Sequence, residues 1–514
     1  MSVFTAIKNE INAAIGYQQA FEELIANGDI GRAISMMEDR SIQAAKNISE
    51  FNTGSHKIMK REPKIIRDKA GNFIRSKDLN KIAIPYPLYI NEIALVFLYG
   101  RPVKWLDGTP KPRREERFAL EEELKGLVEG DSRIDEINAT LETIDAEQRA
   151  LDARFARYKE LLTTARFDAH IREAKRMAGI EGCSAMLYHV YQENNEPQLI
   201  IKVLSKQEND DIYTLFDQYG RLVAFAWGYN TVDSANKTVH HYDIYTADKI
   251  WRCEQKGFGT WDVKEERNMI GKIPVIVFIQ EKEWEQVESM IDRVEKAYSA
   301  VADSNDRFSD PKMVATSDII NKNKLAQQEE ESSVFVLKNG GDLKYLERAD
   351  NNEARNSEIE KLDDMILSKS FTPNLTMEQL KGLGQASGRM LQQYMILADI
   401  KAARHKEKHD EYLSRTSSLV LSILDNVIDV ANKGYSELTV LHEFSEPFGD
   451  DVQQVLTDAI KQYNAGGMSM ETLLEQSYLV KDARLEMERI EREQEEKMQR
   501  YQQQQVIDAF GVAE

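Results

Sequence analysis

A glycine-rich segment is the part of this sequence that comes nearest to a phosphate-binding motif. Lys381 is followed by Gly382, Gly384 and Gly388, and a stretch with helical periodicity begins directly afterwards. Glycine-rich loops at helix N-termini can bind phosphate groups. The third glycine comes one residue too late for G-x-G-x-x-G, however, and the Lys-Ser/Thr pair of a P-loop is missing. We therefore expect a loop that leads into a helix, and no nucleotide cofactor.

Three histidines in strand-like segments are the next candidates for chemistry, as metal ligands. His240 and His241 are adjacent, and His189 lies in an earlier segment of the same kind. No H-E-x-x-H or C-x-x-C motif accompanies them. Isolated histidines in strands are usually packed or solvated, so we expect no metal site.

A helix predicted over residues 283–308 carries a row of acidic side chains. The row consists of Glu288, Asp292, Glu295, Asp303 and Asp306. Carboxylates that converge can hold metal ions for nuclease chemistry. At helical spacing these five form a line along one side of the helix rather than a cluster. We therefore expect a solvated stripe or one that faces a pore, and no catalytic residue.

A basic run interrupts this otherwise acidic chain. It comprises Lys401, Arg404, His405, Lys406, Lys408 and His409. Such a run can contact phosphate groups, or it can pair with acidic neighbours in the same assembly. We favour pairing as the interpretation.

Residues 134–162 have the most regular periodicity in the chain. Apolar side chains recur three and four apart over four heptads, which keeps one helical stripe against a partner helix. The stripe consists of Ile134, Ile137, Leu141, Ile144, Leu151, Phe155, Tyr158 and Leu162, with Gln148 as its polar member. The partner is either another subunit or the neighbouring segments 112–128 and 167–178 of the same chain. Both alternatives are open at this level.

Composition narrows the classes of protein to consider. The chain has 514 residues and a formal net charge of −20, which argues against a surface that wraps DNA, since that needs clustered Lys and Arg. Cys183 and Cys253 are the only cysteines, which excludes a disulfide framework and fits a reducing cytoplasm. The apolar runs are far shorter than the roughly 20 residues that span a bilayer. We expect neither a signal peptide nor a membrane among the partners.

The elements that must position these residues fall into two kinds. Strand-like segments separated by turn residues fill residues 183–279, and helical periodicity dominates the segments on either side. This pattern predicts a meandering β-domain within a longer helical chain. The expected fold class is α+β, mainly helical.

Four segments, in this order, resemble the portal proteins of tailed bacteriophages, specifically the siphovirus-type family. They are residues 80–103, which end in Gly-Arg-Pro-Val; the pair Tyr-Thr-Ala-Asp-Lys-Ile at 245–250 and Gly-Lys-Ile-Pro-Val-Ile at 271–276; residues 289–303; and Gln-Ala-Ser-Gly at 385–388. Gln385 stands where the family usually has Asn, and the heptad stretch looks inserted.

The resemblance implies a ring, usually of twelve subunits, at one vertex of a capsid. Through it double-stranded DNA would be packaged and ejected, with only non-specific contact. The implied partners are the major capsid protein and scaffold, the terminase large subunit as packaging motor, and the head–tail connector. ATP hydrolysis would belong to the motor, so the chain would not be an enzyme. It would reside in the virion after assembly in the bacterial host cytoplasm.

The resemblance also implies a portal architecture with wing, stem, clip and crown. The implied segments are N-terminal helices at 1–60; the wing at 61–282, with a coiled-coil insertion at 131–165 and a β-rich part at 183–279; stem helices at 283–309 and 351–370, with the clip at 310–350 between them; a tunnel loop at 371–388; a long wing helix and return strand at 389–447; and a crown with C-terminal tail at 448–514.

Two site assignments follow from that architecture. The acidic row on the first stem helix would partly face the channel or the neighbouring stem, where it would repel duplex DNA, which carries about one negative charge per 1.7 Å. The tunnel loop would contain Lys381, Gly382, Gly384, Gln385, Ser387 and Gly388. Lys381 would make transient contacts with the phosphate groups of the passing DNA.

Two alternatives from other classes remain. An acidic coiled-coil scaffolding or internal core protein of a capsid would explain the charge and the heptads, although not the β-domain. An enzyme that uses residues 382–388 to bind a nucleotide would process DNA.

Overall fold

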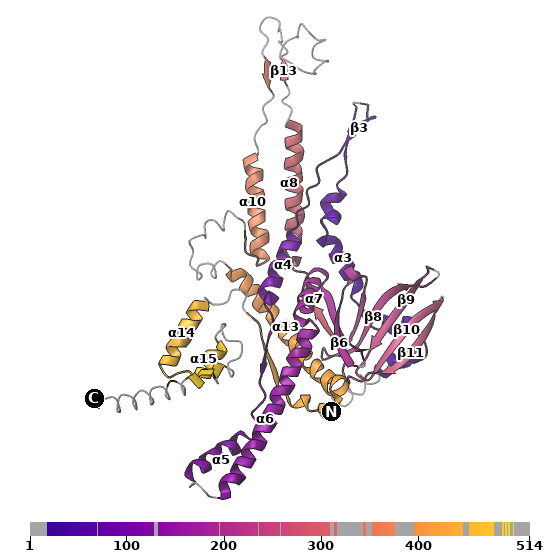
Figure 1. Cartoon of the computed structure of the whole chain (residues 1–514). Coiled ribbons are helices and arrows are strands. Elements are labelled where there is room, and N and C mark those ends of the chain that lie inside the picture. Colours follow the sequence, from indigo (N-terminus) through magenta and orange to yellow (C-terminus); the bar gives the residue numbers. More distant parts are fainter. Residues whose placement is uncertain are drawn as a thin grey trace, which may run out of the picture. The chain divides into compact units, whose positions relative to one another are not determined.

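The computed structural model describes residues 18–68, 70–127, 132–194, 196–234, 236–257, 259–308, 313–315, 343–345, 352–375, 395–445 and 452–476, with a few further positions up to 497 (Figure 1). The chain divides into two compact units, each described here by itself. One comprises Met1–Gly382 and Tyr394–Ser445, and the other comprises Leu383–Gln393 and Glu446–Glu514.

Two antiparallel sheets form the β-rich part of the first unit. The larger has the strand order β1-β7-β8-β9-β10-β11, and the smaller has the order β12-β5-β6. The strands are β1 (Glu38–Asp39), β5 (Cys183–Glu193), β6 (Glu196–Leu204), β7 (Asp211–Phe216), β8 (Leu222–Val232), β9 (Thr238–Tyr245), β10 (Lys249–Gly257), β11 (Thr260–Arg267) and β12 (Val275–Ile279). Consecutive strands from β7 to β11 pair as neighbours, so the predicted meander is confirmed.

Both faces of the larger sheet are covered. Phe21, Ile25 and Ile30 from the N-terminal segment pack against one face, in a cluster with Ile244 and Trp251. The other face packs against the smaller sheet, through side chains of β7, β8, β5 and β12. Helix α2 (Ile30–Ser35) is therefore part of the β-domain, whereas α3 (Ser41–Phe51) packs mainly against helix α7 (Phe167–Glu181).

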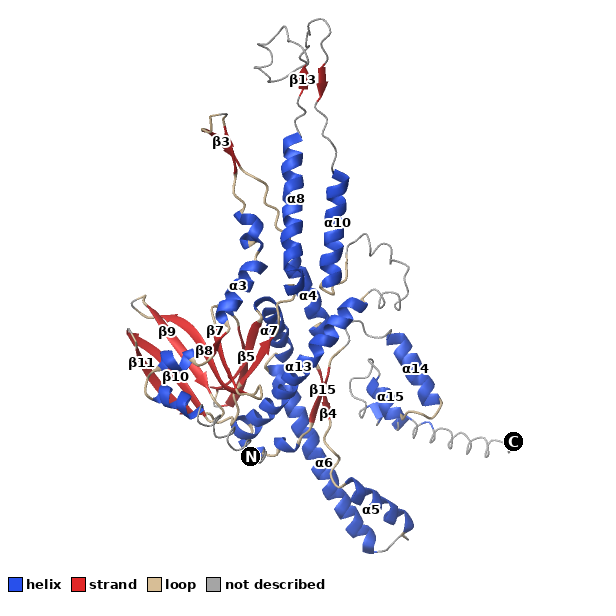
Figure 2. Cartoon of the chain, turned by 180° about the vertical axis from the view of Figure 1, so that it is seen from behind, coloured by secondary structure: helices blue, strands red, loops and turns tan. Residues whose placement is uncertain are grey.

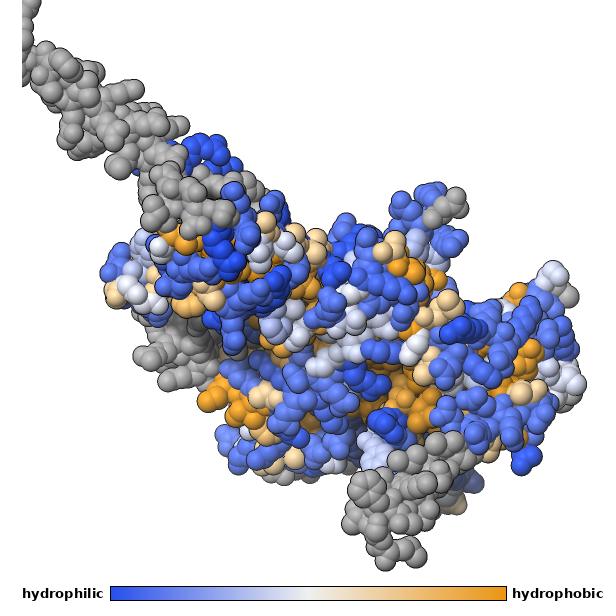
Figure 3. Space-filling model, turned by 90° about the horizontal axis from the view of Figure 1, so that it is seen from below, coloured by the Kyte–Doolittle hydropathy of each residue, from blue (hydrophilic) through white to orange (hydrophobic). Residues whose placement is uncertain are grey.

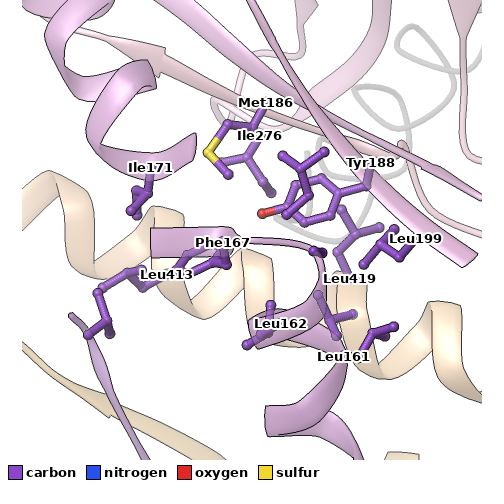
Figure 4. Packing of buried hydrophobic residues seen from close by; sticks show 14 of the residues in the cluster. Leu161, Leu162, Phe167, Ile171, Met186, Tyr188, Leu199, Ile276, Leu413 and Leu419 are labelled. Carbon is purple, nitrogen blue, oxygen red and sulfur yellow. The ribbon is translucent and has the colours of Figure 1, made fainter. Parts of the chain in front are cut away.

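The largest core cluster joins helices to the smaller sheet. It draws side chains from α4 (Tyr86–Tyr99), α6 (Ser132–Thr164), α7 (Phe167–Glu181) and α13 (Ile396–Ile423), together with β5, β6 and β12. Figure 4 shows Leu161, Leu162 and Phe167 lying between α13 and the sheet, near Leu413 and Tyr188. Viewed from below, the surface is largely hydrophilic, with smaller apolar patches between charged side chains (Figure 3).

Helix α6 contains the heptad stripe, and its described contacts lie within the chain. Helix α5 (Arg114–Gly126) packs along its first half, where Ile137 and Ile144 are buried. The ion pair Arg117–Asp145 flanks that contact, with 2.6 Å between nitrogen and oxygen. The second half enters the main core, where Leu151, Phe155, Tyr158 and Leu162 are buried. Of the two open alternatives, the structure shows the intrachain one.

Helix α13 lies in the segment 389–447, for which the resemblance implied a long helix and a return strand. It ends at Ile423 and continues as a π-helical turn, Leu424–Ile428. The Asp425 carboxylate accepts hydrogen bonds from the backbone N–H groups of Gly434, Tyr435 and Ser436, at 2.9 Å each. This cap turns the chain back toward β15 (Val440–Glu443), which pairs with β4 (Lys104–Asp107).

Helices α8 (Glu288–Phe308) and α10 (Asn352–Lys369) form a pair that extends from the helical part of the unit beside α4, with the β-domain to one side (Figures 1 and 2). Ile291 and Val294 of α8 pack with Ile359 and Ile366 of α10. Beyond the pair, β13 (Met313–Ala315) and β14 (Leu343–Tyr345) form a short antiparallel ladder. The observed content of helices and strands confirms the α+β, mainly helical fold class.

The second unit contains α14 (Val452–Asn464) and α15 (Met470–Gln476). Ser469 caps α15, since its hydroxyl accepts a hydrogen bond from the Thr472 N–H at 3.2 Å. A serine at this position satisfies a backbone donor that the helix cannot.

Candidate functional site at the α8–α10 helix pair

The acidic row of α8 binds the segment of chain that precedes α4. The Lys57 ammonium donates to Glu288 and Asp292, at 3.0 and 2.7 Å. Farther along the helix, Asp303 pairs with Arg61 at 2.7 Å and also accepts from the Asn80 backbone N–H at 2.7 Å. These contacts tie residues 56–82 along one side of α8.

Glu295 lies at the centre of this row and is buried, with 1% of its surface exposed. One oxygen, Oε1, accepts from the His56 Nδ1–H at 2.6 Å and from the Ile84 N–H at 2.9 Å. The hydrogen bond to Glu295 raises the pKa of His56, against the opposing effect of burial. The prediction that Glu295 faces a channel or a neighbouring stem is therefore wrong, because this carboxylate is covered by its own chain.

The remaining four carboxylates are also engaged by the chain. Lys282, with 2% of its side chain exposed, pairs with Glu288 at 2.7 Å and with Glu50. Asp306 accepts from the Asn80 side-chain amide at 2.5 Å. The row thus lies against cations and hydrogen-bond donors of the same chain. It is therefore not the solvated or pore-facing stripe that the sequence analysis expected. Spacing alone located the row correctly but could not show its partners.

Helix α10 packs on a different side of α8. Arg293 pairs with Glu358 at 2.6 Å, and the Tyr298 hydroxyl donates to Asp363 at 3.1 Å. At 100° per residue, Ile291 and Val294, which face α10, lie roughly 75° and 135° around α8 from the centre of the acidic row. Helix α8 is therefore held between the 56–82 segment and α10.

A buried charge cluster lies at the base of the pair. Glu283 pairs with Lys401 at 2.8 Å and with Lys175, and its carboxylate contacts the His405 imidazole at 3.2 Å. Burial opposes its ionisation, but Lys175 and Lys401 hold the pKa of Glu283 well below its usual range. Burial lowers the pKa of His405. The acid–base pairing favoured for the basic run is thus confirmed for Lys401 and His405.

The rest of the basic run lies in different surroundings. His409 is buried and contacts the Tyr99 hydroxyl at 2.9 Å. Lys406 lies over the Phe444 ring. Arg404 and Lys408 line an open pocket beside Glu283, together with Lys282, Lys369 and the backbone turn at 369–371.

The histidines considered as metal ligands have other partners. His240 contacts the Asn230 side chain, and His241 contacts Thr231 at 2.7 Å and stacks on Tyr229. Within the described residues, no group of three His, Cys, Asp or Glu side chains is arranged to hold a metal ion. In the same part of the chain, no helix combines the length and hydropathy needed to cross a membrane.

The glycine-rich segment with Lys381, Gly382, Gly384, Gln385, Ser387 and Gly388 lies outside the described residues. The sequence analysis also missed several residues that the structure brings to α8. They are His56, Lys57, Arg61 and Lys282. The run of basic side chains at 56–61 in an acidic chain was the available signal.

Comparison with known proteins gives one family and several structural neighbours. The family model described as "Phage portal protein, SPP1 Gp6-like" matches residues 34–500. A chain from the neck of an empty gene transfer agent (GTA) particle, computed with C6 symmetry, has 9% identity and a TM-score of 0.35, over 77% of this chain and 90% of that one.

Two further neighbours come from native GTA particles. One, from the neck computed with C12 symmetry, has 9% identity and a TM-score of 0.36, over 75% of this chain and 86% of that one. The other, from the virion, has 8% identity and a TM-score of 0.33, over 76% of this chain and 88% of that one. The search of curated proteins found no match.

Proposed function

The chain belongs to the SPP1 Gp6-like family of phage portal proteins, whose model covers residues 34–500, and we propose that its copies close into a ring with a central channel for double-stranded DNA. As a member of that family it is a portal protein, a structural component of the capsid vertex in a virion. The family match carries this conclusion, since it includes the β-domain, the α8–α10 pair and most of the second unit.

The ring would contain twelve copies joined head to tail. A heterologous contact of this kind needs two different faces on each subunit. The α8–α10 pair supports the proposal, because the 56–82 segment covers one side of α8 while α10 covers another. Each copy therefore presents the 56–82 segment at one edge and α10 at the other.

The segment assignments form part of the same proposal. Residues 283–309 and 351–370 would be the stem, 310–350 the clip, 371–388 the tunnel loop with Lys381 near the phosphates, and 448–514 the crown. Residues 61–282 and 389–447 would form the wing. Residues 21–37 pack onto the β-domain, which supports placing the N-terminal helices at 1–60 with the wing as well.

The charge on α8 has a structural role in this proposal. A channel that lets DNA slide must offer few free cations, because each Lys or Arg contact with a phosphate strengthens binding. Lys57, Arg61 and Lys282 are all engaged by carboxylates of α8 or its surroundings. The acidic row therefore contributes by neutralising these cations and by fixing residues 56–82, rather than by repelling DNA directly.

The proposed partners follow from the portal role. They are the major capsid protein and scaffold, the terminase large subunit and the head–tail connector, with double-stranded DNA bound non-specifically. Assembly would take place in the host cytoplasm. ATP hydrolysis would belong to the motor subunit, so the chain itself would catalyse no reaction.

Electron microscopy of the purified full chain tests the proposal directly. Rings with a central hole are expected. Rods or irregular aggregates would favour the scaffolding alternative, and compact monomers that bind a nucleotide in a titration would favour an enzyme. A packaging assay with purified motor and capsids, with and without the chain, then tests the DNA channel.

A further inference from the structure

A hairpin that projects beside α8 has no core of its own. Strands β2 (Lys64–Arg67) and β3 (Phe73–Lys77) pair only with each other, and neither contains a buried residue. The exposed fractions of Ile65, Phe73 and Ile74 are 54%, 62% and 56%. An isolated two-stranded hairpin is at best marginally stable in water. The hairpin therefore needs a surface on which to pack.

Both ends of this hairpin are fixed to α8. Before it, Arg61 pairs with Asp303 and donates to the Asn80 carbonyl at 3.0 Å. After it, the Asn80 N–H donates to the same aspartate, and Asn80 also donates to Asp306. The residues that flank the hairpin are thus fixed to α8, while its two strands are exposed to solvent. This is the arrangement expected of an arm that contacts another molecule.

The hairpin is basic, whereas the chain is acidic. Residues 64–77 contain one acidic side chain, Asp68, and five basic ones: Lys64, Arg67, Lys69, Arg75 and Lys77. The formal net charge of the whole chain is −20. The arm is therefore complementary in charge to the rest of another copy of this chain.

The strand register defines one face that combines charge with apolar surface. Lys64 is paired with Lys77, and Ile66 with Arg75. Since directly paired residues of neighbouring strands point to the same side, Ile66 shares the face of Lys64, Arg75 and Lys77. The register shifts between Ile66 and Arg67, so Phe73 pairs with Arg67 instead, and Ile65 lies on the opposite face with Ser76. An acidic helix with some apolar surface would fit the first face.

Helix α10 carries such an acidic surface at the opposite edge of the subunit. Glu353 and Glu360 are exposed, and their spacing places them on one side of α10, away from Ile359 and Ile366, which face α8. Figures 1 and 2 show α8 between the hairpin and α10, with the hairpin nearest in height to the first turns of α10. Within one subunit, α8 separates the arm from this surface.

We propose that the hairpin of one copy packs across the Glu353–Glu360 side of α10 in the neighbouring copy, with Arg75 and Lys77 paired to those two glutamates. The inference rests on the proposed ring with the α8–α10 pair along its channel. In a closed ring each copy is related to the next by rotation about the axis. An arm at one edge and its acceptor at the other edge, at similar height, then meet in every interface.

A charge-swap series tests this contact by mass photometry and electron microscopy. Replacing Arg75→Glu and Lys77→Glu together should raise the concentration needed for ring assembly at least about tenfold, because like charges then face each other. The matched control is Lys264→Glu with Arg267→Glu, the same change in charge on the exposed strand β11. Adding Glu353→Lys and Glu360→Lys to the hairpin variant should restore assembly.

Cysteine crosslinking tests the contact without relying on charge. The native Cys183 and Cys253 are buried, with 4% and 1% exposed, so they do not compete. Ile66→Cys, on the face of Arg75 and Lys77, combined with Asn356→Cys, an exposed residue between the two glutamates, should give a ladder of disulfide-linked oligomers under oxidation. Ile65→Cys with Asn356→Cys, which uses the opposite hairpin face, is the control and should give far less.

The outcomes separate this inference from the proposed function. A wild-type chain that forms no rings overturns the proposed function and this contact with it. Rings that form normally in the hairpin charge variant, with no crosslink ladder from the Ile66→Cys pair, overturn the contact alone. Loss of binding to a purified connector, with ring assembly intact, would identify another protein as the occupant and would also overturn it.

Discussion

The His56 imidazole and the Glu295 carboxylate form a buried pair, with 2.6 Å between Nδ1 and Oε1, although they lie 239 residues apart in the sequence. The pair fixes the segment before α4 to the middle of α8. Two polar atoms on its far sides, His56 Nε2 and Glu295 Oε2, are buried without a hydrogen-bond partner among the described residues. The strength of the contact between His56 and Glu295 should therefore depend on whether the imidazole is protonated.

Stability should depend on pH through His56. The hydrogen bond to Glu295 raises the pKa of His56 above the ordinary value for a histidine. A raised folded-state pKa gives a stabilisation that is complete below the unfolded pKa and is lost as the pH rises through the folded one. The difference in unfolding free energy between wild type and His56→Gln should thus be largest below about pH 6.5.

Urea denaturation followed by circular dichroism at several pH values measures this difference. His240→Gln is the control, since that imidazole is exposed and contacts only the Asn230 side chain among its described partners. A difference for His56→Gln that is constant, or that grows with pH, would contradict the assignment.

Removing the charge of Glu283 should be costly. Glu283→Gln leaves Lys175 and Lys401 buried without their carboxylate, and breaking a buried ion pair typically costs about 3–5 kcal/mol. Glu358→Gln, in the exposed pair with Arg293, should cost less than about 1 kcal/mol. Equal losses in denaturant midpoints for the two variants would show that the cluster is solvated rather than buried.

The heptad stripe of α6 should stabilise the subunit and leave assembly unchanged. Ile144→Ala removes a side chain that is 1% exposed, and such truncations cost about 2–5 kcal/mol. Glu142→Ala, on the exposed side of the same helix, is the control. Thermal unfolding measures the loss, and mass photometry measures oligomer size. A change in oligomer size without a loss of stability would place the stripe between subunits.

The cap at the end of α13 should depend on one carboxylate. Asp425→Ala leaves three backbone N–H groups without their acceptor, so we expect a loss of about 1–3 kcal/mol. Burial opposes ionisation, but these donors hold the pKa of Asp425 below the ordinary value for an aspartate. Its contribution is therefore present above about pH 3.8 and is lost as the pH falls through the folded pKa.

The matched control for the cap is Glu407→Ala, an exposed acidic residue on the same helix. Both variants are compared with wild type by urea denaturation at neutral and acidic pH. An Asp425→Ala variant as stable as Glu407→Ala at neutral pH would show that water can replace the carboxylate.

Local patterns predicted a large part of the fold. The alternation in residues 183–279 predicted the β-meander, and the periodicity of residues 134–162 predicted α6, because both follow from which side of an element is apolar. The end of α13 has no comparable local signal, since apolar spacing continues through the π-helical turn and the backbone donors that bind Asp425 come from residues 434–436.

For the acidic row of α8, the sequence by itself determined that five carboxylates share one side of a helix, because helical geometry depends only on spacing. Only the tertiary structure decided that Glu295 is buried and that Lys57, Arg61 and Lys282 neutralise its neighbours. The reason is physical: the charge that a carboxylate presents depends on which groups approach it through space, and here those groups come from segments that lie more than 200 residues away for His56, Lys57 and Asn80.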